Sequence, residues 1–229
     1  MSSVVNLEAV RLEYLRRMTQ GDGNLLQQVE QYVVSREGKM LRPQMTLMAA
    51  ATLGEDVLNS RRTLLLATCV EMLHNASLLH DDVIDQADDR RGQPSVNAQW
   101  DNGIAVLVGD YHLAQIMHLL DEVNDPEASR LINNTVMAMV EAELAAKEKV
   151  KPSKERYMRI IDGKTARLFA TACALGNPQY EEFGLHYGRL FQLRDDITDN
   201  ETTQWTAELI ESEEASLAAI KYKLPILNK

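Results

Sequence analysis

The chain has 229 residues, of which 45% are hydrophobic and 25% are charged, and its formal net charge is −10. The length is enough to bury a substantial core, and the composition is ordinary for a soluble globular protein. Nonspecific nucleic-acid binding is not expected of so acidic a chain, although divalent metals can still mediate the binding of anionic substrates.

Helices are expected along almost the whole chain, because strand signals are nearly absent and no two-residue hairpin turn is evident. Gly54 marks a helix end, and Asp125 and Asn177 each place a capping residue before a proline. The pattern predicts a single all-α domain over 1–229, built as a bundle of antiparallel helices around a central cavity. In chain order the predicted helices are 4–20, 24–36, 42–53, 60–86, 103–121, 126–149, 153–175, 178–200 and an acidic segment at 201–220.

The N-terminus and the cysteines favour a cytoplasmic protein. The N-terminal residues lack the apolar stretch of a signal peptide, and no apolar run approaches membrane-spanning length. Cys69 and Cys173 both lie in apolar helical surroundings, so we expect reduced, buried core thiols. We therefore expect a cytoplasmic location and no integral membrane segment.

The predicted helix at 60–86 carries a single polar stripe on an otherwise apolar surface. Its polar residues recur at steps of three and four: Glu71, His74, Asn75, Asp81, Asp82 and Asp85. A buried helix with one polar stripe is expected to line an internal cavity. Asp81 and Asp85 lie one turn apart, so their carboxylates can share a hard cation.

A second acidic cluster repeats the same spacing. The sequence FQLRDDITDN at 191–200 places Asp195, Asp196 and Asp199 at the end of another apolar helix. One such cluster is explained about equally well as a solvated helix end. Two copies, each closing an apolar helix, favour a site for several Mg²⁺ ions, which typically bring phosphates with them.

Basic residues lie near helix boundaries or on polar faces, at Lys39, Arg42, Arg90, Arg91 and Lys164. Any one of them alone is better explained as a surface salt bridge. Together with two acidic clusters, they indicate two diphosphate sites, because arginine suits phosphate through its planar fork and lysine acts as a point charge. One site would be held through metals and the other directly by Lys39, Arg42 and Arg91.

These motifs together resemble the trans-isoprenyl diphosphate synthases, the polyprenyl synthetase family. The resemblance runs in order from about residue 35 to 200 and rests on G-K-x-x-R-P at 38–43, His74, D-D-x-x-D-x-x-x-x-R-R-G at 81–92, VLVGDYHLA around Asp110, G-K-T-A at 163–166 and F-Q-x-x-D-D-x-x-D at 191–199. It implies the isoprenoid synthase fold and the condensation of isopentenyl diphosphate with an allylic diphosphate.

The resemblance implies a role for each matched residue. The main Mg²⁺ ligands, for three ions, would be Asp81, Asp85 and Asp195, with Asp82, Asp196 and Asp199 as supporting ligands. Arg90, Lys164 and Gln192 would hold the allylic diphosphate. Isopentenyl diphosphate would be held by Lys39, Arg42, His74 and Arg91. Thr165 would line the site near the reacting carbons.

Product length in such enzymes is gated by the side chains one turn before the first acidic motif, here Ala76 and Ser77. Both are small, so the resemblance implies a product longer than farnesyl. The alternative is that Leu73 or Met117 closes the tunnel and gives a shorter product. The resemblance also implies a homodimer, with 103–120 as a candidate interface, although an internal core role for that segment is equally open.

The region 201–229 departs from the family, which usually continues with a glycine- and lysine-rich loop and several more helices. Here an acidic segment without glycine follows Asn200, so the chain resembles a shortened synthase. A non-catalytic or regulatory subunit that pairs with a longer catalytic partner is therefore an alternative. A terpene cyclase or head-to-head coupling enzyme of the same fold is another, and a plain metal-binding bundle is the third. The second D-D-x-x-D motif, with Lys39 and Arg42, favours chain elongation.

Overall fold

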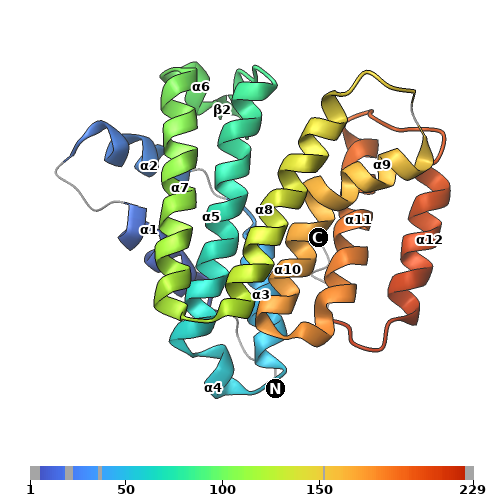
Figure 1. Ribbon diagram of the computed structural model, residues 1–229, viewed down its shortest axis with the longest axis horizontal. Helices are drawn as coiled ribbons and strands as arrows, with labels where there is room; N and C mark the ends of the chain where they lie inside the picture. Colours follow the sequence, from blue (N-terminus) through green and yellow to red (C-terminus); the bar gives the residue numbers. More distant parts are fainter. Residues whose placement is uncertain (1–5, 19–22, 36–37, 152, 225–229) are drawn as a thin grey trace. The chain divides into compact units, whose positions relative to one another are not determined.

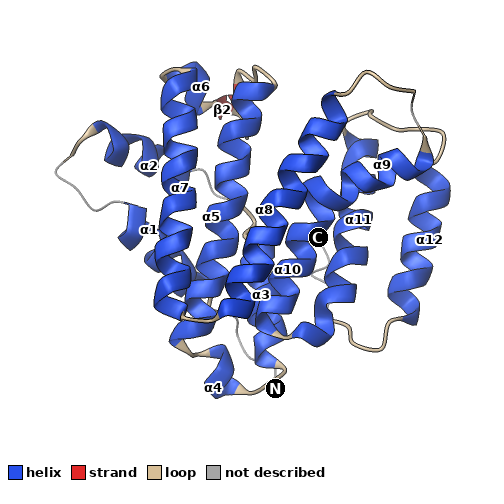
Figure 2. Ribbon diagram, in the orientation of Figure 1, coloured by secondary structure: helices blue, strands red, loops and turns tan. Residues whose placement is uncertain are grey.

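The structure is a computed structural model that describes residues 6–18, 23–35, 38–151 and 153–224. Helices make up nearly all of these ranges (Figure 2), so the all-α prediction is confirmed. The chain divides into two compact units, which are described here one at a time. The first unit comprises 1–44 and 60–125, and the second comprises 45–59 and 126–229. The expectation of one domain over 1–229 stays a prediction.

In the first unit, α5 and α7 run side by side (Figure 1). The Ser60 side chain caps α5 by accepting a hydrogen bond from the Thr63 N–H at 3.2 Å. A core cluster that includes Val29 and Leu79 joins α2 and α5 to the helices that follow. The elements are α1 (Leu7–Met18), α2 (Leu25–Ser35), the start of α3 (Leu41–Ala51), α5 (Arg61–Ile84), β1 (Asp89–Arg90), β2 (Gln93–Pro94), α6 (Val96–Gln99) and α7 (Asn102–Val123).

In the second unit, α10 is buried along most of its length and packs against α11 (Figure 1). Glycine allows this close packing, because a Cβ on Gly184 would lie only 2.5 Å from the Phe169 carbonyl oxygen. The elements are the rest of α3, α4 (Glu55–Leu58), α8 (Pro126–Lys147), α9 (Lys154–Ile161), the π-helical turn η1 (Asp162–Ala166), α10 (Arg167–Gly176), the 3₁₀ turn η2 (Pro178–Tyr180), α11 (Glu181–Thr198) and α12 (Thr206–Ala219).

The predicted helices agree with the structure to within a few residues at most ends. The predicted segments 4–20 and 24–36 extend partly outside the described residues. Two internal details differ: the segment 153–175 is α9, η1 and α10 rather than one helix, and 178–200 begins with η2. The short helices α4 and α6 were not predicted.

The prediction that the chain contains no two-residue hairpin turn is wrong. β1 and β2 pair antiparallel, with Asp89 opposite Pro94 and Arg90 opposite Gln93, which leaves Arg91 and Gly92 as the loop. Their φ angles of +58° and +76° are those of a type I′ turn. Asn-Gly or Asp-Gly usually marks such a turn. Arg-Gly is not such a signal, and this is why the hairpin was missed.

Two further expectations concern the membrane and the cysteines. α7 is long and apolar enough to span a membrane, a property that the core helix of a soluble protein shares. The expectation of no integral membrane segment therefore stays a prediction. Cys69 and Cys173 are buried thiols, as expected. Burial raises the pKa of both and takes that of Cys69 to about 12, so both thiols are protonated at neutral pH.

Candidate active site

The first D-D-x-x-D motif ends α5 in a Schellman motif. Asp85 is the C-cap residue, and Gln86 follows it in the left-handed region with φ +53°. The Ala87 N–H donates back to the Asp82 carbonyl at 2.9 Å, and the Gln86 N–H donates to the Val83 carbonyl at 3.3 Å. These are the two hydrogen bonds that define the motif.

The second D-D-x-x-D motif ends α11 in the same way. Asp199 is the C-cap residue, and Asn200 is left-handed with φ +59°. The Glu201 N–H donates to the Asp196 carbonyl at 2.8 Å, and the Asn200 N–H donates to the Ile197 carbonyl at 3.3 Å. The repeated sequence spacing therefore corresponds to a repeated backbone geometry, once in each unit.

Each motif concentrates negative charge where a helix already carries partial negative charge. Like-charged side chains one turn apart repel one another, and carboxylates at a helix C-terminus are disfavoured by the macrodipole. Three aspartates at such an end need positive charge nearby. Protein cations or bound metal ions can supply it.

The middle aspartate of each motif is buried and hydrogen-bonded by the protein. Asp82 is 2% exposed and accepts a hydrogen bond from Arg90 Nε at 2.8 Å. Asp196 is 6% exposed and accepts from Gln192 Nε2 at 2.7 Å and from the Tyr157 hydroxyl. The more exposed members of the two motifs are the outer aspartates, Asp81, Asp85, Asp195 and Asp199.

The outer aspartates fit a magnesium ion that is only partly coordinated by protein. Within the described residues, no three carboxylate, imidazole or thiol side chains are grouped so that they could hold a metal ion by themselves. Mg²⁺ usually takes one or two carboxylates and completes its shell with water and substrate phosphates. The metal-ligand roles of the six aspartates, main and supporting, stay predictions. Asp196 fits a supporting role best, because both of its oxygens accept protein hydrogen bonds.

A cluster of basic residues in the first unit contains most of the predicted isopentenyl diphosphate ligands. Burial lowers the pKa of Arg42 to about 10, with Glu71 opposing this shift and Arg91 adding to it. Burial lowers the pKa of His74 far below its usual value, and Arg42, Arg91 and Arg90 lower it further. The His74 imidazole is therefore neutral at pH 7.

Among the described residues, Glu71 is the one carboxylate that shifts the pKa of Arg42, and none shifts that of His74. Burial raises the pKa of Glu71, while Arg42 and Arg91 lower it. Arg42 and Arg91 thus act on both His74 and Glu71, and Arg90 acts on His74 as well. Several guanidinium groups gathered in this part of the first unit suit it to an anion.

Arg91 packs directly against the G-K-x-x-R-P motif. A Cβ on Gly38 would lie 2.8 Å from Arg91 Nη1, so only glycine leaves room for the guanidinium. Arg91 and Met40 are both left-handed, with φ of +58° and +47°. Such a conformation costs a non-glycine residue roughly 1–2 kcal/mol. Backbone strain of this kind clusters at functional sites. Lys39, between Gly38 and Met40, is exposed.

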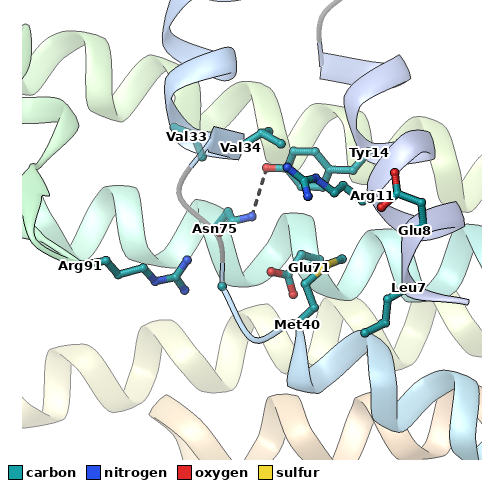
Figure 3. A pocket seen from close by; sticks show the side chains of 11 residues that line it. Leu7, Glu8, Arg11, Tyr14, Val33, Val34, Met40, Glu71, Asn75 and Arg91 are labelled. Atoms are coloured by element: carbon teal, nitrogen blue, oxygen red, sulfur yellow. Dashed lines mark hydrogen bonds between the residues drawn. The ribbon is translucent and has the colours of Figure 1, made fainter. Parts of the chain in front are cut away.

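A pocket of about 260 Å³ lies beside the basic cluster. Its walls come from α1, α2, the loop at 38–40, α5 and the turn of the hairpin. Figure 3 shows the Arg91 guanidinium pointing into the pocket from one side, with Glu71 and Asn75 of α5 ahead of it and Arg11 of α1 on the other side. The polar stripe predicted on 60–86 therefore does line a cavity, at Glu71 and Asn75.

A buried hydrogen-bond network holds Asn75 in the pocket wall. Asn75 Nδ2 donates to the Tyr14 hydroxyl at 3.2 Å (Figure 3), and this hydroxyl lies 3.2 Å from His112 Nε2. His112 Nε2 also lies 3.0 Å from Glu30 Oε2, and both Glu30 and His112 are fully buried. Tyr14, Glu30 and His112 could not be predicted as a group from the sequence, because they come from α1, α2 and α7 and belong to no shared motif.

In the second unit, Lys164 and Thr165 lie in η1, inside the G-K-T-A motif. Arg189 fixes the start of this turn through two hydrogen bonds to the Asp162 carboxylate, at 2.5 and 2.8 Å. Lys164 Nζ is 2.5 Å from Glu143 Oε2 of α8. Single π-helical turns within α-helices are frequent at functional sites.

A chain of hydrogen bonds joins η1 to the second acidic motif. The Thr165 hydroxyl donates to Gln192 Oε1 at 2.6 Å, and Gln192 Nε2 donates to Asp196. Three of the predicted site residues are thereby joined by hydrogen bonds: Thr165, Gln192 and Asp196. Glu143, Asp162 and Tyr157 were missed, because each lies outside the motifs.

The predicted chain-length residues differ in their surroundings. Ala76 is 1% exposed and belongs to the core, whereas Ser77 is half-buried and donates a hydrogen bond to the His74 carbonyl at 2.9 Å. Leu73 is buried, and Met117 is 66% exposed. The chain-length role of each of these residues stays a prediction.

Comparison with known proteins places these motifs in a family. The sequence model of the polyprenyl synthetase family matches residues 23–209. The chain belongs to the polyprenyl synthetase family. A curated relative in this family, all-trans-nonaprenyl-diphosphate synthase (geranyl-diphosphate specific) from Rhodobacter capsulatus, is 38% identical over 187 residues, which are 76% of this chain and 57% of the relative.

A second polyprenyl synthetase relative, heptaprenyl diphosphate synthase component 2 from Bacillus subtilis, is 32% identical over 83% of this chain and 58% of its own length. Among solved structures, a polyprenyl synthase from Caulobacter crescentus complexed with calcium and isoprenyl diphosphate superposes with a TM-score of 0.79 at 31% identity, over 86% of this chain and 63% of the other. The fold is therefore that of the isoprenoid synthases, as expected. The chain spans less than two thirds of the length of each of these relatives.

Proposed function

We propose that the chain is a Mg²⁺-dependent prenyltransferase that condenses isopentenyl diphosphate with an allylic diphosphate to make a polyprenyl diphosphate longer than farnesyl. The observation that carries this proposal is the presence of two acidic motifs with the same helix-end geometry in a chain that also has a pocket lined by Arg11 and Arg91. The printed names of the relatives, nonaprenyl and heptaprenyl diphosphate synthases, support a long product.

The allylic diphosphate is assigned to the acidic motifs. The outer aspartates would hold Mg²⁺, which would neutralise charge on the departing diphosphate. Arg90 of the first unit, and Lys164 and Gln192 of the second, are assigned as candidate donors to this diphosphate. Arg90 also donates a hydrogen bond to Asp82, and Gln192 donates one to Asp196. Each of these two side chains would therefore both position an acidic motif and bind the substrate.

Isopentenyl diphosphate is assigned to the pocket in the first unit. Arg42 and Arg91 offer planar donor forks for its diphosphate, and Lys39 adds an ammonium group. His74 is neutral, so it contributes a hydrogen bond without adding charge. Binding both substrates at close range turns their reaction into an effectively unimolecular step.

The reaction itself needs little from the protein beyond placement and shielding. The allylic carbon–oxygen bond breaks, and the double bond of isopentenyl diphosphate attacks the cation. The proton lost from the new chain passes to the released diphosphate. Apolar helices around the site keep water away from the cation, and Thr165 lies near the reacting carbons.

We also propose that the protein is a cytoplasmic homodimer that binds neither nucleic acid nor membrane. Leu107 and Met117 of α7 support a dimer interface there, since they are 68% and 66% exposed.

One observation favours a second candidate function. The Bacillus subtilis relative is named as component 2 of its synthase, which is the name of one part of a two-part enzyme. The chain could in the same way be a subunit that acts only with a partner chain. No observation favours the third candidate, a terpene cyclase, because the relatives described above are all named as synthases.

The test is to incubate the purified protein with Mg²⁺, labelled isopentenyl diphosphate and farnesyl diphosphate, and to resolve the extracted products by carbon number. We expect products longer than farnesyl that disappear when Mg²⁺ is chelated. Asp81→Ala and Asp195→Ala should each lower turnover by at least about 100-fold, the scale seen when a charge-stabilising group is removed.

Either remaining outcome would change the assignment. No turnover, with diphosphate binding still detectable, would indicate the subunit function and a search for the partner chain. No turnover and no binding would reject both functions.

A further inference from the structure

The second acidic motif is held by a residue that lies outside the motifs named in the sequence analysis. Tyr157 of α9 donates its hydroxyl to Asp196 Oδ2, and Gln192 donates to Asp196 Oδ1 at 2.7 Å.

Tyr157 is held in turn by the start of the C-terminal helix. The Trp205 ring lies 6.5 Å from the Tyr157 ring, tilted by 36°. Both rings pack on a buried cluster formed by Ile161, Leu193 and Leu209. These three residues come from α9, α11 and α12, so the cluster joins all three helices at the place where Asp196 is held.

Ion pairs connect α12 to other helices of the second unit. Lys154 Nζ lies 2.7 Å from Glu208, and Arg194 Nη2 lies 2.7 Å from Glu214. The buried Glu213 contacts His186 and lies 3.5 Å from Arg189, the residue that holds Asp162 at the start of η1. α12 is therefore connected to both ends of the hydrogen-bond chain between η1 and Asp196.

We propose that Tyr157 is a positioning residue for the second acidic motif, and that Trp205 at the start of α12 sets the position of Tyr157. The proposal rests on the proposed function, because it assigns Asp195 and Asp199 to Mg²⁺. With both oxygens of Asp196 fixed, the last turn of α11 is fixed as well, and the two outer carboxylates project from it in one orientation. In this way the start of α12 contributes to the acidic site.

The experiment measures binding of inorganic diphosphate in the presence of Mg²⁺ by calorimetry, without any turnover. Tyr157→Phe removes only the hydroxyl and should weaken binding about 10-fold, the lower end of the effect of losing a partner that orients a metal ligand. Tyr187→Phe is the matched control. This substitution also removes one phenolic hydroxyl, but from a ring of α11 that packs on Phe169 and Phe183. The Tyr187→Phe variant should therefore bind diphosphate with the affinity of the wild type.

Trp205→Ala tests the second half of the proposal. It should weaken binding by less than Tyr157→Phe, and the double variant should be no weaker than Tyr157→Phe alone, because Trp205 acts through Tyr157. Unfolding midpoints of all the variants separate this effect from a general loss of stability. Additive effects of the two substitutions would overturn the role of Trp205.

The outcomes for Tyr157 and for the proposed function are distinguishable. Wild-type affinity in Tyr157→Phe, with affinity lost in Asp195→Ala, would reject the positioning role and leave the proposed function standing. A wild-type protein that shows no Mg²⁺-dependent diphosphate binding would overturn both.

Discussion

At the scale of single residues, Gly38 and Arg91 form the contact on which the pocket depends most. A methyl group at position 38 would lie 2.8 Å from Arg91 Nη1, so the guanidinium must move. We expect Gly38→Ala to weaken isopentenyl diphosphate binding about 10-fold, or roughly 1.4 kcal/mol, measured by calorimetry. In an Arg91→Ala background the same substitution should have almost no further effect. Equal losses in both backgrounds would contradict the assigned contact.

Ser77 is the better of the two positions at which to test product length. Ala76 lies in the core, where a larger side chain would also cost stability by overpacking, roughly 1–3 kcal/mol. Ser77 is half-buried, so Ser77→Phe should shorten the longest product while changing the unfolding midpoint little. Ser77→Ala is the matched control and should keep the wild-type product. An unchanged product distribution in Ser77→Phe would place the end of the tunnel elsewhere.

Glu13 gives a pH-dependent contribution to stability. Burial opposes its ionisation, but hydrogen bonds from Arg16, Arg61 and Arg17 outweigh this and lower its pKa from 4.5 to about 2. Because folding lowers this pKa, the ionised Glu13 stabilises the folded protein at any pH above 4.5, the pKa in the unfolded chain. This stabilisation is lost as the pH falls from 4.5 toward 2.

Glu13→Gln should therefore lower the free energy of unfolding by about 3 kcal/mol at pH 7. Urea unfolding should show this difference shrinking between pH 4.5 and 3. Glu127→Gln, which removes an exposed partner of Arg130, should change stability by less than about 1 kcal/mol. A difference that does not vary with pH would contradict the assigned pKa.

Much of the residue-level site could be predicted, because its members carry recognisable chemistry at fixed spacing. Arg42, His74 and Arg91 do act on one another, and Thr165 and Gln192 do join Asp196. Tyr157 could not be predicted in the same way. Its hydroxyl reaches Asp196 across 39 residues of sequence, and only tertiary packing brings the two together.

At the scale of secondary structure, η1 depends on close contact with α8. A Cβ on Gly163 would lie 2.3 Å from Ala142 Cβ and 2.6 Å from the Ala138 carbonyl oxygen. Because that oxygen is backbone, Gly163→Ala should lower the free energy of unfolding by roughly 1–3 kcal/mol despite the higher helix propensity of alanine. Gly103→Ala, which would meet only the Asp101 side chain, is the control. Equal stability of both variants, measured by urea unfolding, would contradict the contact.

The positions of the helices could be predicted, but their irregularities could not. Capping residues such as Ser60 and Asn177 mark helix starts in the sequence, and the structure has side-chain caps there. No residue in 162–166 signals the π-helical turn in the sequence, because G-K-T-A is compatible with a regular α-helix. Its geometry depends on the Arg189–Asp162 pair, which comes from another helix.

At the scale of the whole molecule, the long helix α7 is the place to test self-association. Leu107 is 68% exposed on this helix. We expect Leu107→Arg to halve the mass seen in sedimentation, because a buried charge opposes an apolar interface. Leu144→Arg on α8, where leucine is 65% exposed, should leave the mass unchanged. A wild-type monomer would reject the homodimer.

The all-α class and the family could be predicted for the whole chain, since both depend on patterns that extend over most of its length. The division into two units could not. Neither unit is continuous in sequence. The first comprises 1–44 and 60–125, and the second comprises 45–59 and 126–229. Sequence punctuation marks where helices end, and it carries no information about which helices pack together.

The left-handed Arg91 has a consequence for laboratory evolution. Its φ of +58° suits asparagine or glycine better than arginine, so replacing Arg91 by either should make the hairpin more stable. The same replacement would remove the guanidinium that points into the pocket. A library screened only for heat resistance would therefore enrich variants at this position that no longer bind substrate, and position 91 should be held constant in such a screen.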